Sequence, residues 1–265
     1  IGLGKIGSRL FEIFNKHTDV KFVCGRKKSD KLISLKKKYG IKICNNYKKI
    51  PNEIDLAVIA TPSKTHYPIA KEFLSFNKAV FIEKPLCTKL KEAKELVNLA
   101  KEKNLKLYVD DVFLHRTEYY KLKDVLSGRE IKNIKFKWEK YGSFNDSILN
   151  ALVYHDMYLL IDLLGVGNLN KIDITKNENP LKDNRSDILE FKFNYKGAII
   201  ECSYDRTQKN NKSKTLDITY LDNNLEKKIE WSNNKFSIDG KNMKLKEEDA
   251  LTTMIRKILN NKAEY

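Results

Sequence analysis

The chain has 265 residues, of which 41% are hydrophobic, and this length allows one large domain or two ordinary ones, of which we expect two. No run approaches the roughly eighteen apolar residues of a membrane-spanning helix, so we expect no membrane partner. The net charge of +16 is spread along the chain with no zinc-finger or aromatic RNA-binding motif, which favours solvated surfaces and the steering of anionic ligands over nucleic-acid binding.

From residue 8 to residue 109, predicted helices and strands alternate. Helices are expected at 8–15, 30–39, 66–76 and 90–103, and strands at 20–24, 54–60, 79–82 and 105–109. This alternation predicts a parallel, doubly wound sheet, and short apolar strands suit such a sheet because helices cover both of its faces. We therefore expect an α/β dinucleotide-binding Rossmann domain over residues 1–114.

Beyond residue 115 the pattern changes to a few helices followed mostly by strands. Helices are expected at 119–126, 148–164 and 251–261, and strands at 131–141, 188–195, 198–204, 215–221 and 227–231. Turn signals separate the strands, and the polar stretch 208–214 is interpreted as a mobile loop. Residues 115–265 are thus expected to form an α+β domain with a largely antiparallel open sheet, which serves substrate binding and oligomerisation.

A glycine-rich motif opens the chain, with Gly2, Gly4 and Gly7 in the spacing of a phosphate-binding loop. Gly2 can make the tight turn, Gly4 lets the backbone approach a pyrophosphate, and Gly7 lets the following helix pack on the sheet. A plain glycine turn between strand and helix is the alternative. A strand of about five or six residues normally precedes such a loop. Only Ile1 precedes it here, so we expect the chain to be truncated at both ends.

The end of the second predicted strand indicates which cofactor the loop would take. An acidic residue there would bond the ribose 2′-hydroxyl of NAD, but this strand ends in Cys24-Gly25-Arg26-Lys27-Lys28. Arg26 can hold a 2′-phosphate in a bidentate contact, and Lys27 or Lys28 can add positive charge. NADP(H) is therefore favoured, with NAD(H) possible, and the alternative is a solvated basic turn.

Three further segments, read together, resemble the Gfo/Idh/MocA oxidoreductase family, which includes glucose-fructose oxidoreductase and inositol dehydrogenase. They are Val58-Ile59-Ala60-Thr61-Pro62 with His66, then Phe81-Ile82-Glu83-Lys84-Pro85, then Tyr154-His155-Asp156. The resemblance implies a Rossmann domain followed by an α+β domain. It also implies hydride transfer between a nicotinamide and a sugar, nucleotide-sugar or polyol carbon.

The resemblance assigns roles in the first half of the chain. Lys84 matches the catalytic lysine, and a lysine at the carboxyl end of a parallel strand points into the ligand crevice, where it can stabilise charge on the reacting oxygen. The alternative is an exposed lysine in a turn. Glu83 is expected to orient Lys84 or the ribose. The expected cofactor-binding residues are Gly2, Gly4, Lys5, Ile6, Gly7, Gly25, Arg26, Lys27, Ala60, Thr61, Pro62, His66, Glu83 and Lys84.

In the second half, the resemblance assigns His155 to proton transfer at the substrate hydroxyl, a role that the near-neutral pKa of histidine allows. A histidine on an apolar helix is otherwise a core residue. The family usually carries an Asp four residues before this His, and here that position is Ala151. Loss of this carboxylate leaves open a catalytically impaired protein that binds NADP(H) or a sugar as a regulator. Candidate substrate contacts are Asn150, Tyr154 and Asp111.

The cysteines and histidines indicate no metal site. Cys24, Cys44, Cys87 and Cys202 form no CxxC pair and lie mostly in apolar runs, so we expect small core side chains and a reducing, cytoplasmic location. The resemblance implies a homo-oligomer, dimer or tetramer, formed through the sheet of the second domain.

Overall fold

The computed structural model describes residues 1–25, 30–142, 146–169, 171–181, 186–233, 235–246 and 248–260. The chain divides into two compact units, Ile1–Asp110 together with the C-terminal segment from Leu251, and Asp111–Ala250. The division lies close to the boundary expected after residue 114. The last helix, α7 (Ala250–Leu259), groups with the first unit rather than the second. Leu259 of this helix lines a cavity of the first unit. An amphipathic helix packs against an available apolar surface, whichever part of the sequence supplies that surface.

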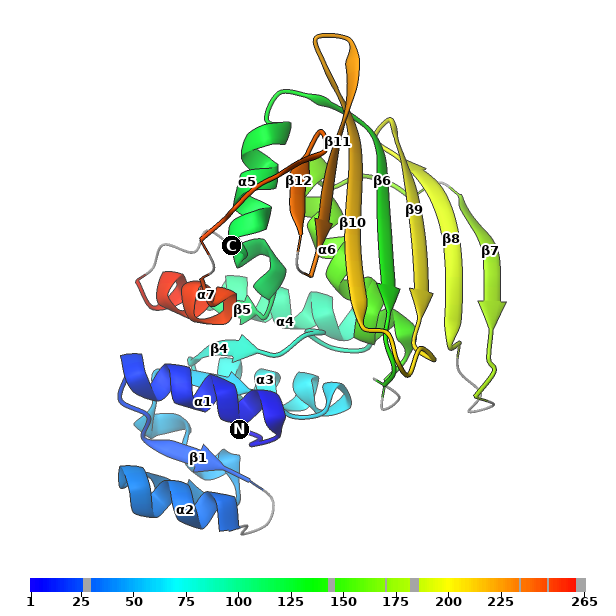
Figure 1. Cartoon of the computed structure of the whole chain (residues 1–265). Coiled ribbons are helices and arrows are strands. Elements are labelled where there is room, and N and C mark those ends of the chain that lie inside the picture. Colours follow the sequence, from blue (N-terminus) through cyan, green and yellow to red (C-terminus); the bar gives the residue numbers. More distant parts are fainter. Residues whose placement is uncertain are drawn as a thin grey trace. The chain divides into compact units, whose positions relative to one another are not determined.

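The first unit is the predicted α/β domain with parallel strands (Figure 1). β1 pairs with β2, and β4 lies between β3 and β5, all in parallel. The strands are β1 (Phe22–Cys24), β2 (Lys42–Cys44), β3 (Leu56–Ile59), β4 (Ala79–Ile82) and β5 (Leu107–Val109), and the helices are α1 (Lys5–His17), α2 (Asp30–Tyr39), α3 (His66–Ser75) and α4 (Leu90–Glu102). The sequence did not predict β2, which is only three residues long and begins with an exposed lysine.

The first two residues lie between the two sets of strands. The Ile1 amine donates to Val58 O at 2.6 Å, Ala60 N donates to Ile1 O at 2.8 Å, and Gly2 N donates to Cys24 O at 3.0 Å. Ile1 therefore occupies the position of the strand expected before the glycine loop. A cavity of about 570 Å³ is lined by residues of β1, β3 and α1, including Phe22 and Leu56.

The second unit is built on one eight-stranded sheet in the order β13-β12-β11-β10-β6-β9-β8-β7. Only the β6–β9 pair is parallel among the described strand pairs of this sheet, so the largely antiparallel sheet is confirmed. Its strands are β6 (Glu130–Glu139), β7 (Ile172–Glu178), β8 (Ile188–Tyr195), β9 (Ala198–Asp205), β10 (Ser213–Asp222), β11 (Leu225–Ser232), β12 (Phe236–Ile238) and β13 (Lys241–Asn242). The unpredicted strands β7, β12 and β13 lie at or near the sheet edges.

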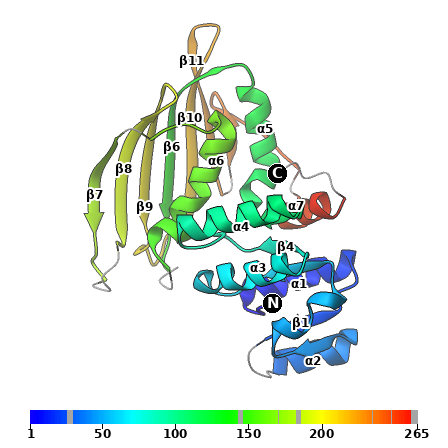
Figure 2. The ribbon, with the colours of Figure 1, turned by 180° about the vertical axis from the view of Figure 1, so that it is seen from behind.

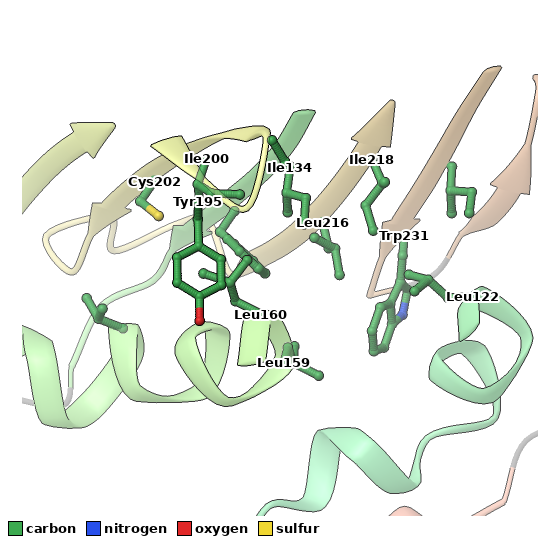
Figure 3. Packing of buried hydrophobic residues seen from close by; sticks show 14 of the residues in the cluster. Leu122, Ile134, Leu159, Leu160, Tyr195, Ile200, Cys202, Leu216, Ile218 and Trp231 are labelled. Atoms are coloured by element: carbon green, nitrogen blue, oxygen red, sulfur yellow. The ribbon is translucent and has the colours of Figure 1, made fainter. Parts of the chain in front are cut away.

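Two helices, α5 (Thr117–Leu126) and α6 (Tyr154–Leu164), cover one face of this sheet (Figure 2). Alternate residues of the long strands point toward them, as the period-2 pattern of β8 and β9 requires. Figure 3 shows the resulting core, in which Leu159 and Leu160 of α6 and Leu122 of α5 face the sheet residues Ile134, Tyr195, Ile200, Cys202, Leu216, Ile218 and Trp231. The sheet thus fixes the face that α6 presents.

Two expectations about individual side chains need correction. The stretch 208–214 is not a loop throughout, because β10 begins at Ser213 and Lys214 is part of the strand. Cys24 and Cys202 are buried as expected, whereas Cys44 and Cys87 are only partly buried, and all four thiols are free. None of the helices in the described ranges is long and apolar enough to span a membrane.

Candidate functional site

The glycine loop at the start of α1 shows why each glycine is needed. Gly2 has φ +87°, and a Cβ atom there would lie 2.5 Å from Ala60 O. A Cβ atom on Gly7 would overlap Gly2 O. A Cβ atom on Gly4, in contrast, would meet no atom within 4 Å. Gly2 and Gly7 are therefore required by the protein's own packing, whereas the open space at Gly4 fits the approach of a ligand.

Gly4 is also the N-cap of α1, and no side chain caps this helix end. The first turn contains no acidic residue, and Lys5 and Ile6 at the helix start are exposed. Amide groups at such an uncapped N-terminus, with the positive end of the helix dipole, attract phosphate. The residues of this loop thus fit a dinucleotide.

The end of β1 is where cofactor choice was predicted. Gly25 N donates to Cys44 O at 3.0 Å, which places Gly25 at the carboxyl end of β1. Arg26 and Lys27, expected to bind a 2′-phosphate, lie outside the described residues, as does Lys28. The preference for NADP(H) therefore stays a prediction from the sequence.

The segment after β3 is held by a buried histidine. Thr61 Oγ1 accepts a hydrogen bond from Thr65 Oγ1 at 2.8 Å, and Pro62 O accepts one from Thr65 N at 2.8 Å. The His66 ring is 1% exposed, with Nε2 2.7 Å from Thr61 O and Nδ1 2.7 Å from Pro85 O. His66 therefore ties the segment after β3 to the Glu-Lys-Pro segment after β4. Its ring faces backbone oxygens, so it shapes the expected cofactor site through Thr61 and Pro85.

Two carboxyl groups lie at neighbouring strand ends beside Lys84. Glu83 N donates to Ile59 O at 2.8 Å and Asp110 N donates to Ile82 O at 2.9 Å, so both residues directly follow strands of the parallel sheet. Burial, together with the charge and hydrogen bond of Asp110, raises the pKa of Glu83 to about 9, while Lys84 opposes the rise. Burial and Asp110 therefore favour the protonated form of Glu83, the residue directly before Lys84.

In the second unit, His155 lies among aromatic rings near the start of α6. Its ring stacks on Trp138 at 5.7 Å between centroids and 19° between planes, and Phe113 meets it edge-on at 5.0 Å. His155 Nδ1 is 3.1 Å from the Tyr158 hydroxyl, which accepts a hydrogen bond from Phe113 N at 3.2 Å. The imidazole is half-buried, so it can reach solvent or a ligand while its orientation is fixed.

The next residue, Asp156, is fully buried and points to the sheet. Its Oδ2 accepts hydrogen bonds from Trp138 Nε1 at 2.7 Å and from the Tyr204 hydroxyl at 3.0 Å. Its Oδ1 is 3.1 Å from Lys214 Nζ. Sequence reasoning missed this cluster, although an aspartate within an apolar helix is a signal that it must find buried partners.

The expected continuous helix 148–164 begins with a π-helical turn, Leu149–Val153, before α6. A π-helical turn holds one extra residue, so residues before it rotate by about 100° relative to those after it. In an uninterrupted α-helix Ala151 shares the side of His155 and Asn150 does not. Asn150 and Ala151 both lie within the π turn, where hydrogen bonds join residues five apart, which is the separation of Asn150 from His155. Asn150 Nδ2 donates to Asp146 Oδ1 at 2.9 Å, which orients its amide.

The other two substrate candidates also belong to the second unit. Tyr154 packs edge-on against Tyr158 at 5.8 Å between ring centroids. Asp111 Oδ1 is 3.4 Å from His115 Nε2, and His115 Nδ1 is 3.1 Å from the Tyr120 hydroxyl. Asp111 thus belongs to a polar group with His115 and Tyr120. Within the described part of the chain, no three His, Cys, Asp or Glu side chains are grouped so that they could hold a metal ion.

Comparison with known proteins places the first unit in a family. Residues 1–111 match the sequence model GFO_IDH_MocA, described as the oxidoreductase family with an NAD-binding Rossmann fold. An uncharacterised oxidoreductase YdgJ of Escherichia coli is 29% identical over 140 residues, which cover 48% of this chain and 40% of that protein. A dTDP-3,4-didehydro-2,6-dideoxy-alpha-D-glucose 3-reductase of Streptomyces violaceoruber is 26% identical over 121 residues, covering 45% of this chain and 35% of that protein.

Solved structures share the fold along nearly the whole chain. The UDP-N-acetylglucosamine 3-dehydrogenase GnnA of Acidithiobacillus ferrooxidans superposes with a TM-score of 0.82, covering 98% of this chain and 86% of that one. The two sequences are 16% identical, so this likeness concerns the fold. The matched segments span about half or less of the length of the curated relatives, 54% of a 28.5 kDa Methanothermus fervidus protein and 40% of YdgJ.

Proposed function

We propose that this chain, whose residues 1–111 match the Gfo/Idh/MocA oxidoreductase family, transfers hydride between a nicotinamide cofactor and a carbon of a sugar, nucleotide sugar or polyol. The observation that carries the proposal is the glycine loop, in which Gly2 and Gly7 are enclosed by protein and Gly4 faces open space at the start of α1. Relatives named for nucleotide-sugar 3-reductase and 3-dehydrogenase activity support this substrate class.

The chain's own residues divide the binding of the cofactor. Gly2, Gly4 and Gly7, with Lys5 and Ile6, would hold the pyrophosphate through backbone amides. Gly25, Arg26 and Lys27 would select the 2′-phosphate, which makes NADP(H) the favoured cofactor. Ala60, Thr61 and Pro62, braced by His66, and Glu83 with Lys84 would line the nicotinamide end. When bound, the nicotinamide supplies or accepts the hydride.

Two residues would handle the oxygen of the reacting carbon. The Lys84 ammonium bonds that oxygen and stabilises the charge that develops on it. His155 gives or takes the proton, and its contact with Tyr158 fixes the ring for this exchange. Asn150 is proposed to bind a substrate hydroxyl in place of the carboxylate absent at Ala151, since it lies in the π turn five residues before His155. Tyr154 and Asp111 are proposed as further substrate contacts.

A cytoplasmic homo-oligomer, formed through the open sheet face, completes the proposal. That face carries lysines interleaved with acids, such as Lys135 with Glu201 at 3.0 Å and Lys192 with Asp173 at 3.5 Å. Alternating charge of this kind suits contact with another protein surface better than a nucleic-acid backbone, which needs a contiguous basic face.

The proposal is tested by titrating the purified protein with NADPH and NADH, then following absorbance with keto-sugars, nucleotide sugars and cyclic polyols. We expect NADPH to bind more tightly and to turn over with at least one of these classes. Arg26→Ala should remove the preference, since a charge-assisted hydrogen bond contributes about 1.5–3 kcal/mol, or about tenfold and more in affinity. Equal affinities that Arg26→Ala leaves unchanged would contradict the NADP assignment.

Ala151 supports one alternative, a protein that binds NADP(H) or a sugar as a regulator and has lost catalysis with the carboxylate. Such a protein would bind the cofactor tightly and show no hydride transfer with any substrate of the panel. Turnover in the wild type, lost in Lys84→Ala, excludes it.

A further inference from the structure

Lys214 is a largely buried lysine of the second unit that shares aromatic neighbours with His155. Its side chain is 11% exposed, with Nζ 3.5 Å from the Phe113 ring centroid and 4.4 Å from that of Trp138. The Asp156 carboxylate at 3.1 Å is its ionic partner. Burial lowers the pKa of Lys214, and the charge of Asp156 opposes the change. Taking an ammonium out of water costs several kcal/mol. The contacts of a buried lysine must therefore offset this desolvation cost.

The contacts of Lys214 are the same groups that enclose His155. Trp138 stacks on the imidazole and Phe113 meets it edge-on, so both rings lie between the lysine and the histidine in the contact network. A cation over an aromatic face is attracted by the ring quadrupole, and more strongly when it is desolvated. Asp156 adds a second link, since it accepts the Trp138 N–H at 2.7 Å while pairing with Lys214.

Stability alone does not explain this arrangement. Replacing a buried ion pair by apolar side chains of similar volume is often neutral or stabilising. The pair does, however, restrict the orientation of the Trp138 ring. The Asp156 carboxylate accepts a hydrogen bond from the edge of the ring, and the Lys214 ammonium lies over its face. An apolar pair would fill the same volume without fixing that ring.

We propose that Lys214 is a positioning residue for His155, acting through Asp156 and through the Trp138 and Phe113 rings. The lysine anchors the two rings, the rings set the plane of the imidazole, and Tyr158 sets its rotation. The structural part rests on the described contacts alone, and the effect on catalysis rests on the proposed oxidoreductase function.

The test compares Lys214→Met with the wild type and with Lys121→Met. Methionine keeps most of the apolar stem and removes the charge. Lys121 is the matched control, a 36% exposed lysine of α5 whose surface pair with Asp124 should contribute little. The first readout is the ¹H–¹³C spectrum of the histidine rings without ligand, with the His155 signal identified through His155→Gln. We expect Lys214→Met to move the His155 signal, and Lys121→Met to leave it in place.

The second readout is kinetic. A small misplacement of a catalytic group costs up to about a hundredfold in rate, so we expect Lys214→Met to lower kcat about tenfold to a hundredfold. The KM and the dissociation constant of NADPH should stay near their wild-type values, because the Lys214 ammonium contacts Asp156 and the two rings. A kcat that stays at the wild-type value, or falls only together with a weaker KM and a lower melting temperature, would overturn positioning in catalysis.

If Lys214→Met leaves Asp156 as an unpaired buried charge and fails to fold, the double variant Lys214→Met/Asp156→Asn removes both charges. We expect this variant to fold and still to move the His155 signal. An unmoved signal in a folded variant overturns the proposal. If the variant moves the His155 signal but the wild-type protein is inactive with every substrate, the positioning role is supported and the oxidoreductase function is contradicted. Failure of the positioning role and failure of the proposed function are therefore distinguishable.

Discussion

The two units hold their candidate functional residues in different ways. In the first, the residues lie at strand ends and at the start of a helix, and short-range backbone contacts place them, as Gly7 against Gly2 O and His66 between Thr61 O and Pro85 O illustrate. In the second, His155 is placed by side chains from several elements, including Phe113, Trp138 and Tyr158. In the first unit, short sequence motifs and backbone contacts therefore place the candidate residues. In the second unit, the packing of side chains from different elements places them.

The largest expected effect is in the first unit. Lys84→Ala removes the group that would stabilise charge on the reacting oxygen, and turnover should fall on the order of 10²–10³-fold. The dissociation constant of NADPH, measured by fluorescence titration, should change far less. Lys94→Ala, an exposed lysine of α4, is the control and should leave both quantities unchanged. Wild-type turnover in Lys84→Ala would exclude the lysine from the reaction.

The glycine loop offers a matched pair of variants that separates packing from binding. Gly7→Ala puts a methyl group onto Gly2 O and should destabilise the protein by about 1–3 kcal/mol in urea unfolding, and should also abolish cofactor binding. Gly4→Ala meets open space and should cost at most about 1 kcal/mol, the scale of a lost helix cap, while still weakening NADPH binding. Unchanged NADPH affinity in Gly4→Ala would show that no ligand approaches there.

The π turn predicts a smaller, substrate-dependent effect in the second unit. Asn150→Ala removes one neutral hydrogen bond to substrate, worth about 0.5–1.5 kcal/mol, so kcat/KM should fall by up to about tenfold. NADPH affinity should not change. Asn133→Ala removes an amide of β6 that bonds Glu201 at 2.9 Å and is the control. Equal kinetics for all three proteins would argue against a substrate contact at Asn150.

The last expected effect is a pH dependence of stability from Glu83. Its pKa is about 9 in the folded protein and near the ordinary value of 4.5 when unfolded, so between these pH values the folded state binds more protons. The free energy of unfolding should therefore fall as pH rises from about 5 to about 9. Glu83→Gln should flatten this slope in urea unfolding at several pH values. If Glu83→Gln leaves the pH dependence of the free energy of unfolding unchanged, a group other than Glu83 takes up the proton on folding.

Much of the fold followed from periodicity. The α2, β4 and β8 segments have the bounds that the sequence predicted, because each is an apolar pattern closed by turn residues. The short or edge strands β2, β7, β12 and β13 were missed, since partners in the sheet rather than local preference make them strands. Helix α7 was expected in the second unit but groups with the first. The reason is related: the sequence shows that the helix has an apolar face, but not which surface that face packs against.

Sequence alone located the glycine loop, the Glu-Lys-Pro segment and the apolar helix that carries His155, because each is a pattern of residues close together along the chain. Only the tertiary structure decided that Lys214, in a stretch rich in lysine, is largely buried, and that Asp156, Phe113 and Trp138 contact it. Register between strands and helix packing create that cluster. Neither is visible in the spacing of residues that lie far apart in sequence.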